Sequence, residues 1–232
     1  MSESINILVV EDDKNAAYLL VENLRLSKYN VVLADDGDQG LDMFTKSNFN
    51  LCILDIMLPR RDGLDLANEI RSINPKIPII FLTARTLSSD IIEGFKAGCD
   101  DYITKPYNID ELLWRVKAIL RRKDDSEKKT VEGVYKYPNF SFKYSERDLD
   151  INGNLFSLST KEADILKCLA DNLDQTISRN TIMEHVWGND DYFTSKSLDV
   201  YLTKIRKYLS KADNIKLINI HGHGYKLMIT SD

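Results

Sequence analysis

The sequence predicts two domains of different fold class: a doubly wound α/β domain with a parallel sheet, followed by an α+β winged helix-turn-helix domain. Over residues 1–122, short apolar runs alternate five times with segments of helical period, which is typical of a parallel sheet. Residues 123–130 (KDDSEKKT) contain no apolar side chain and indicate a solvated linker, placed at 123–132. Over residues 133–232 the pattern changes to short alternating strands, three helices and a final hairpin.

The strands of the first domain are expected to be buried, because most of them are continuous apolar runs of the kind covered on both faces. They are predicted at residues 5–10, 31–34, 51–54, 77–83 and 101–104. The helices are predicted at residues 14–27, 37–47, 63–73, 88–97 and 109–122. Strict alternation of strand and helix implies crossover connections and therefore parallel strands.

The second domain begins with antiparallel strands. Residues 135–151 alternate polar and apolar side chains, with turn signals at 138–139 and 152–153. Ser159 and Glu162 form a capping-box pattern that opens the first of three helices. The helices are predicted at residues 160–172, 178–187 and 195–210, and a hairpin with its turn at 221–224 is predicted within residues 215–228.

Composition limits the classes of protein to be considered. The chain has 232 residues, of which 43% are hydrophobic, and a formal net charge of −5, so it is expected to fold and to bind nucleic acid only through a local patch. Cys52, Cys99 and Cys168 are isolated and odd in number, which favours buried thiols in a reducing compartment over a disulfide or zinc framework. No signal peptide and no apolar run of ~20 residues is found, so a cytoplasmic protein that does not enter the membrane is expected.

Charged residues follow three of the predicted strands. Glu11 and Asp12 come after the first strand, Asp55 after the third, and Lys105 after the fifth. The carboxyl ends of parallel strands form the crevice where open α/β sheets bind ligands, so these side chains are expected in one pocket. Crowded carboxylates repel one another unless a cation lies among them, and a hard divalent ion with oxygen ligands is the natural occupant. The pattern predicts a site that holds a phosphoryl group on a carboxylate, with Lys105 facing the added anion.

Each of these residues also has an ordinary structural interpretation when it is taken singly. An acidic residue after a strand is most often a helix N-cap, which applies to Asp12 and to Asp13. An isolated lysine is most often a surface residue. The interpretation as a site depends on all of these residues occurring together at successive strand ends.

Seven motifs resemble a known family in the expected order. In the first domain they are ILVVEDD (7–13), LCILDIMLPRRDG (51–63), IIFLTAR (79–85) and DDYITKP (100–106). In the second they are LSTKEADIL (158–166), SLDVYLTKIRKYL (197–209) and HGHGYKL (221–227). The chain resembles the two-component response regulators of the OmpR/PhoB class, which implies a flavodoxin-like (βα)5 receiver domain and a winged-helix DNA-binding domain.

The resemblance implies roles for the pocket residues. Asp55 would be the phosphoacceptor, taking a phosphoryl group from a sensor histidine kinase. Glu11, Asp12 and Asp55, with the backbone carbonyl of Met57, would ligate Mg²⁺. Lys105 would pair with the phosphoryl oxygens, and its peptide bond to Pro106 is cis in the family.

The resemblance also implies a switch and a dimer. Thr83 would move to the phosphoryl group, and the Tyr102 ring would turn inward into the vacated space. Phosphorylated family members form homodimers through the fourth helix, fifth strand and fifth helix. The corresponding residues here are Asp100, Asp101, Glu111, Arg115 and Arg122. Ile91 departs from the family, which usually has Lys or Arg there to meet the residue at Glu111, so a weaker or shifted dimer is expected.

The third helix of the second domain has two faces. Its apolar stripe is made by Leu198, Leu202, Ile205 and Leu209, and a basic face lies broadly opposite. The resemblance marks it as a recognition helix for the major groove of promoter DNA. The contacting positions in this helix are Lys196, Ser197, Tyr201, Thr203, Lys204, Arg206 and Lys207.

The hairpin departs from the family at the wing. His221 stands where the family usually has an arginine that enters the minor groove, so a weaker contact is expected, sensitive to pH near neutrality. Metal binding by His221 and His223 is disfavoured because no further ligands lie nearby in the sequence. The loop of residues 187–193 contacts RNA polymerase in the family, and a purely structural loop anchored by Trp187 is nearly as well supported.

Three other functions fit these residues less well. A phosphatase that forms an aspartyl-phosphate usually has Asp-x-Asp after a strand, whereas Ile56 and Met57 follow Asp55 here. A flavodoxin-like cofactor binder would need a phosphate-binding loop after the first strand, and none is found. A regulator that works without phosphate is disfavoured by the intact pocket, though only a chemical test excludes it. The chain is therefore expected to be a phosphorylation-controlled transcription regulator that binds paired half-sites. It is not expected to be an enzyme, apart from slow autodephosphorylation.

Overall fold

The computed structural model describes residues 4–85, 87–126, 133–188 and 192–229. The chain divides into two compact units, Met1–Lys128 and Lys129–Asp232, which are described separately. In the described residues, the three cysteines are free and buried, as predicted. None of the described helices is long and apolar enough to cross a membrane.

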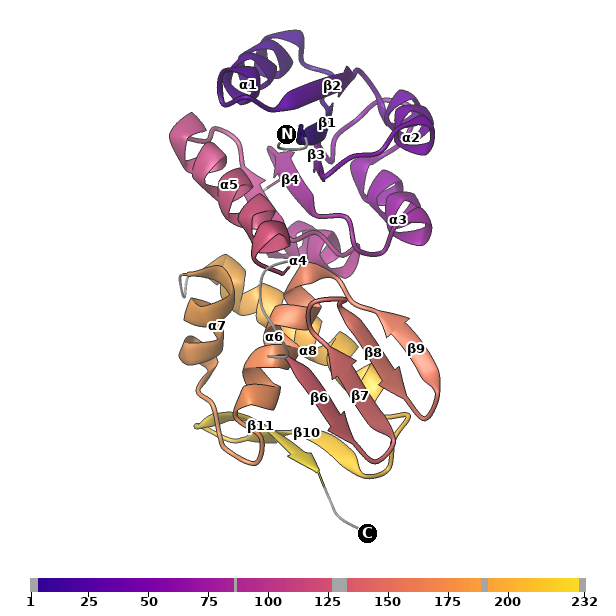
Figure 1. The fold of residues 1–232 in the computed structure, drawn as a ribbon. Coiled ribbons are helices and arrows are strands. Elements are labelled where there is room, and N and C mark those ends of the chain that lie inside the picture. Colours follow the sequence, from indigo (N-terminus) through magenta and orange to yellow (C-terminus); the bar gives the residue numbers. More distant parts are fainter. Residues whose placement is uncertain (1–3, 86, 127–132, 189–191, 230–232) are drawn as a thin grey trace. The chain divides into compact units, whose positions relative to one another are not determined.

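The first unit is a five-stranded parallel sheet with helices between its strands (Figure 1). The strand order is β2-β1-β3-β4-β5, as in a doubly wound fold, which confirms the predicted fold class. The strands are β1 (Asn6–Val10), β2 (Asn30–Ala34), β3 (Leu51–Leu54), β4 (Ile79–Thr83) and β5 (Asp101–Thr104). The helices are α1 (Lys14–Leu26), α2 (Gly37–Lys46), α3 (Gly63–Ile73), α4 (Ser88–Lys96) and α5 (Ile109–Ser126).

The core of this unit lies where α1 and α5 cover one face of the sheet. Apolar side chains of β1, β3 and β4 pack there against Leu20 and Leu24 of α1 and Leu112 and Val116 of α5. Figure 1 shows α2 and α3 on the other side of the sheet. The apolar runs of β3 and β4 are completely buried, as expected for strands covered on both faces. The polar residues at the carboxyl ends of these strands therefore lie at the edge of the sheet.

Two boundaries in this unit differ from the sequence prediction by more than one residue. Helix α5 continues through the first four residues of the predicted linker, to Ser126, because this stretch contains no glycine or proline that would end a helix. Residues 127–132, the remainder of the predicted linker, lie outside the described residues. Strand β4 begins at Ile79 rather than at residue 77, since Pro78 has no N–H to donate to a neighbouring strand.

The second unit is a winged helix-turn-helix, as predicted. An antiparallel sheet of four strands comes first, in the order β6-β7-β8-β9, and a two-stranded hairpin of β10 and β11 ends it. The strands are β6 (Val134–Tyr137), β7 (Phe140–Lys143), β8 (Asp148–Ile151), β9 (Asn154–Ser157), β10 (Ile215–Ile220) and β11 (Gly224–Ile229). The helices are α6 (Thr160–Asp171), α7 (Arg179–Trp187) and α8 (Tyr192–Leu209).

Two local predictions in this unit are confirmed. Ser159 and Glu162 form a complete capping box at the start of α6. The four residues of the predicted apolar stripe on α8 are all buried. Helix α8 begins at Tyr192, earlier than the sequence predicts.

Candidate functional site

Three carboxylates meet at the carboxyl ends of β1 and β3. Val10 and Leu54 are partners in the parallel pairing of these strands, so the residues that follow them emerge side by side. One carboxylate oxygen each from Glu11, Asp12 and Asp55 lies within 4.8 Å of the others. Glu11 and Asp55 are buried, whereas Asp12 is exposed. The sheet thus brings together the predicted acidic residues.

Lys105 joins two of these carboxylates from the end of β5. Its Nζ atom lies 2.6 Å from Oε2 of Glu11 and 2.6 Å from Oδ2 of Asp55. The other carboxylate oxygen of Asp55 accepts a hydrogen bond of 2.9 Å from the backbone N–H of Met57. The peptide bond between Lys105 and Pro106 is cis. Asp55 is therefore oriented from two sides, by an ammonium group and by a backbone amide.

The electrostatics of the pocket favour an added cation. Burial raises the pKa of the Glu11 carboxyl, although its hydrogen bond to Lys105 works in the opposite direction. Burial lowers the pKa of Lys105, but hydrogen bonds to Asp55 and Glu11 outweigh it and the net shift is upward, so the lysine stays charged. One cation thus faces three carboxyl groups. An all-oxygen set of this spacing and charge suits a hard divalent ion such as Mg²⁺.

Asp13 is the N-cap residue of α1. Its side chain caps α1 by accepting hydrogen bonds from the backbone N–H groups of Asn15 (2.8 Å) and Ala16 (3.0 Å). These hydrogen bonds lower the pKa of Asp13. Of the three consecutive acidic residues, Glu11 and Asp12 contribute to the pocket and Asp13 starts the helix.

The two predicted switch residues are linked through Arg85, which sequence reasoning did not single out. Thr83 Oγ1 accepts a hydrogen bond of 3.2 Å from the Arg85 backbone N–H. The Tyr102 hydroxyl donates to the Arg85 carbonyl at 2.9 Å. The Tyr102 ring is buried beside Phe81 and Phe95, with ring centroids 6.3 Å and 6.2 Å away. The ring therefore has an inward position. The position of Arg85 in the loop directly after β4 is the sequence feature that could have identified it.

The acidic residues predicted at a dimer interface have partners within the same chain. Asp100 is buried, and its Oδ2 accepts hydrogen bonds of 2.9 Å from Arg71 of α3 and from the backbone N–H of Ile79. Its prediction as an interface residue is therefore corrected, because its carboxylate points into its own domain. Asp101 pairs with Arg115 at 3.0 Å, and Arg115 also pairs with Glu111 at 2.7 Å.

The Arg122 side chain lies outside what the structure describes, although its backbone belongs to α5.

The predicted DNA-contacting residues of α8 divide by exposure. Thr203 and Lys207 are exposed, and Lys196, Lys204 and Arg206 are half-buried. Ser197 and Tyr201 are fully buried, so they are not part of an exposed contact face.

The apolar side of α8 is wider than its leucine and isoleucine stripe. At 100° per residue, Tyr201 lies only about 60° from Leu198. Its ring packs against Trp187 of α7, with 6.2 Å between the ring centroids. Tyr201 therefore belongs to the contact between α7 and α8, and its prediction as a DNA contact is corrected.

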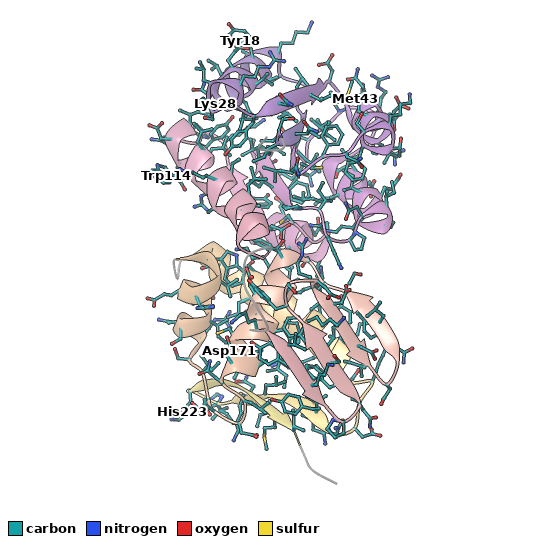
Figure 2. The ribbon with its side chains drawn as sticks, viewed as in Figure 1. Tyr18, Lys28, Met43, Trp114, Asp171 and His223 are labelled. Carbon is teal, nitrogen blue, oxygen red and sulfur yellow. The ribbon has the colours of Figure 1, made fainter. Side chains whose placement is uncertain are left out.

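The wing is the hairpin of β10 and β11. His221 is exposed in its turn, and His223 lies at its free end (Figure 2). A ring nitrogen of His223 is 2.9 Å from the His221 carbonyl oxygen. Among the described residues, the acidic pocket is the single group of three or more side chains spaced for metal binding, and it contains no histidine.

Comparisons with known proteins agree with this geometry. Residues 7–117 match the family described as response regulator receiver domain, and residues 153–227 match transcriptional regulatory protein, C terminal. The transcriptional regulatory protein RprY of Bacteroides fragilis is 45% identical over 98% of this chain and 96% of its own. The sensory transduction protein RegX3 of Mycobacterium tuberculosis is 32% identical over 96% of this chain and 98% of its own.

A solved structure covers both domains. The response regulator DrrB of Thermotoga maritima, described as an OmpR/PhoB homologue, is 30% identical with a TM-score of 0.51, covering 98% of this chain and 100% of its own. A parallel-sheet domain with an acidic pocket, followed by a winged helix, defines a phosphorelay regulator that binds DNA. The chain belongs to the OmpR/PhoB-type response regulators of two-component systems, which act as transcriptional regulators.

Proposed function

We propose that Asp55 accepts a phosphoryl group from a phosphohistidine of a sensor histidine kinase. The observation that carries this proposal is the Asp55 carboxylate, held 2.6 Å from the Lys105 ammonium beside Glu11 and Asp12. In the transfer, a carboxylate oxygen of Asp55 forms a bond to phosphorus while the bond from phosphorus to the histidine nitrogen breaks. The products are an acyl phosphate and a free histidine, so the protein is a phosphoryl acceptor rather than a metabolic enzyme.

Glu11, Asp12 and Asp55, with the Met57 backbone carbonyl, would hold Mg²⁺ at this site. When bound, the ion supplies charge neutralisation for the transferring phosphoryl group. Lys105 contributes from the protein side. Its ammonium leaves its present contact with Asp55 Oδ2 to pair with a phosphoryl oxygen. The same positive charge therefore faces a carboxylate in the unphosphorylated form and a phosphoryl group in the phosphorylated form. Slow hydrolysis of the acyl phosphate acts as a timer.

The new phosphoryl group biases a switch made by Thr83 and Tyr102. The Thr83 hydroxyl turns from the Arg85 N–H toward a phosphoryl oxygen, and the inward Tyr102 ring stabilises the resulting loop. A homodimer then forms through α4, β5 and α5. Because Asp101 and Arg115 already pair within the chain, dimerisation exchanges this internal pair for one with the second copy. Such an exchange contributes little net free energy.

The second domain reads promoter DNA with α8 in the major groove. Its proposed contacts are Lys196, Thr203, Lys204, Arg206 and Lys207, which are at least partly exposed. His221 of the wing approaches the adjacent minor groove. Two copies would occupy direct-repeat half-sites, and the loop that follows Trp187 would contact RNA polymerase. The protein acts where promoter DNA lies, in the cytoplasm.

Intact mass spectrometry tests the proposal. The chain is incubated with Mg²⁺ and acetyl phosphate or a phosphorylated histidine kinase, and a gain of about 80 Da, one phosphoryl group, is expected. Asp55→Asn should lose the gain. Asp42→Asn, an exposed carboxylate that pairs with Lys46 on α2, is the matched control and should keep it. A folded wild type that gains no mass would instead support a regulator that works without phosphate.

A further inference from the structure

Arg179 connects three elements of the DNA-binding domain. It is the first residue of α7. Its Nη1 atom donates to Oδ1 of Asp199 on α8 at 2.7 Å and to the hydroxyl of Tyr225 on β11 at 2.8 Å. Nε and Nη2 lie 3.3 Å and 3.1 Å from the hydroxyl of Ser195, and Nη2 also donates to the Ser195 carbonyl. One side chain thus joins α7, the recognition helix and the wing.

These contacts use the full donor capacity of the guanidinium. An arginine has five N–H groups in a fixed fork and no acceptor. Nη1 has two partners, Nη2 has two, and Nε has one, so each N–H has an acceptor within the protein. The hydrogen bond to Asp199 raises the pKa of Arg179, so it remains charged. No N–H is left over for a DNA phosphate unless one of these contacts is broken.

The wing strand is also held close to the start of α7. The backbone groups of Tyr225 and Ile177 exchange two hydrogen bonds of 2.9 Å. A Cβ added at Gly224 would lie 1.9 Å from the Ile177 carbonyl oxygen, so only glycine permits this approach. From α8, the guanidinium of Arg206 lies 5.7 Å from the centre of the Tyr225 ring and donates to the Leu217 carbonyl of β10. Tyr225 is therefore the point where the wing meets both helices.

We propose that Arg179 is a positioning residue that sets the orientation of the recognition helix relative to the wing without binding DNA itself. The helix and the wing would enter neighbouring grooves, so they must be held at one relative orientation to bind together. Arg179 fixes it by holding Ser195 and Asp199 at the N-terminal part of α8 and the Tyr225 hydroxyl on the wing. The expected effect of Arg179 on DNA affinity depends on the proposed DNA-reading surface, whereas its expected effect on the position of the wing does not.

Hydrogen exchange of the full-length protein tests the positioning role without DNA. In Arg179→Ala, the backbone amides of Ile177 and Tyr225 should exchange at least about tenfold faster, because the side-chain contact that supports their pairing is gone. Amides of the four-stranded sheet should be unchanged. Arg179→Lys should behave like Arg179→Ala, since a single ammonium cannot reproduce the fork.

Tyr225→Phe removes one oxygen and keeps the measurement decisive if the arginine variants do not fold. It should accelerate exchange of the same two amides by a smaller factor. Unchanged exchange of these amides in the folded variants would overturn the proposal.

DNA binding separates positioning from direct contact. The probe is a duplex of about 25 bp, enough for two half-sites, selected from a random library by the phosphorylated wild type. Anisotropy titrations over a range of KCl concentrations measure the DNA affinity of each variant. Arg179→Ala and Arg179→Lys should both bind at least about tenfold more weakly than the wild type, whereas the slope of log affinity against log salt concentration should be unchanged. A slope lowered by ~0.9 in Arg179→Ala and restored in Arg179→Lys would show a phosphate contact and overturn the proposal.

A matched control removes a positive charge elsewhere in the same domain. Lys143→Ala, on β7, loses an exposed side chain that pairs with Glu146, and its affinity and exchange should match those of the wild type. If the wild type selects no duplex, the proposed DNA-reading surface fails. The exchange measurement still decides the role of Arg179 in that case.

Discussion

Lys105 and Asp55 form an ion pair at the carboxyl end of the parallel sheet, with 2.6 Å between Nζ and Oδ2. The same ammonium is 2.6 Å from Oε2 of Glu11. Both carboxylates are buried, and the lysine is mostly buried as well. One positive charge therefore compensates two buried negative charges, and the stability of the pocket depends on it.

Replacing Lys105 with alanine should lower the free energy of unfolding by about 2 kcal/mol near neutral pH, because two buried carboxylates lose their counter-charge. MgCl₂ should recover part of this loss, since a divalent cation supplies charge to the same carboxylates. We therefore expect MgCl₂ to raise the Tm of Lys105→Ala by more than it raises the Tm of the wild type. Thermal and urea denaturation with and without MgCl₂ measure both effects.

The matched control for this prediction is Lys46→Ala. Lys46 pairs with Asp42 on the exposed face of α2, so its removal should cost no more than about 0.5 kcal/mol. In Lys46→Ala, MgCl₂ should raise the Tm by the same amount as in the wild type. An equal Tm increase in Lys105→Ala and the wild type would contradict the prediction.

The pH dependence of stability should reveal the buried carboxyl of Glu11. Burial raises its pKa above the usual value. The native state then binds this proton more tightly than the unfolded chain does, so the stabilising contribution is complete below about pH 4.5 and is lost as the pH rises through the native pKa. Glu11→Gln does not titrate. Relative to the wild type, it should therefore gain stability as the pH rises above about 4.5.

Urea denaturation at several pH values, in buffer free of divalent ions, measures this difference. Glu22→Gln, which replaces a half-buried carboxylate of α1 that pairs with Arg25, is the control for the change of a carboxylate to an amide. A wild type that gains stability relative to Glu11→Gln as the pH rises would have the opposite sign and disprove the interpretation.

The fold and the acidic pocket could be predicted because their signals are local. Each strand is an apolar run, and each pocket residue directly follows a strand, so a parallel sheet gathers Glu11, Asp12, Asp55 and Lys105 without further information. The alternation of strand and helix that predicts this sheet is itself a short-range pattern. The elements expected on this basis are those the structure has, apart from their ends.

Pairings between distant segments could not be predicted in this way. Asp100 is bound by Arg71 and Ile79, which lie 29 and 21 residues earlier in the chain, and no periodicity links them. Tyr201 is buried because Trp187 of α7 covers it, whereas the pattern within α8 identifies only the aliphatic stripe.

Arg71 should contribute strongly to the stability of the receiver domain through Asp100. Its guanidinium binds the Asp100 carboxylate and the carbonyl groups of Gly98 and Ile77. Arg71→Ala should cost about 3 kcal/mol, because a buried carboxylate loses its charged partner. Asp100→Asn should cost less, since the amide oxygen can still accept the Ile79 N–H. Urea denaturation gives both values.

Asp100→Asn also tests the correction to the dimer interface, with Arg115→Ala for comparison. If Asp100 is internal, Asp100→Asn should dimerise as the wild type does after phosphorylation, measured by light scattering under conditions where both proteins are folded. Arg115→Ala removes the internal partner of Asp101 and should change the dimerisation constant. A dimer lost in folded Asp100→Asn would restore that residue to the interface.

Gly94 and Tyr102 supply the final prediction, because the glycine leaves room for the inward ring. A Cβ at Gly94 would lie 2.9 Å from Cδ2 of Tyr102. In a solvent-exposed helix interior, Gly→Ala stabilises a protein by ~1 kcal/mol. Here, Gly94→Ala should instead destabilise the protein by about 1–2 kcal/mol, because the added methyl group overlaps the Tyr102 ring. It should also push this ring away from the Arg85 carbonyl. Urea denaturation measures the sign, and ¹⁹F NMR of fluorotyrosine-labelled protein, with Tyr102→Phe for assignment, reports the ring. The control is Glu93→Ala, an exposed neighbour on α4 that should leave the Tyr102 signal unchanged. A Gly94→Ala protein that is more stable, with the Tyr102 signal unmoved, would show that the glycine is not required for the inward ring.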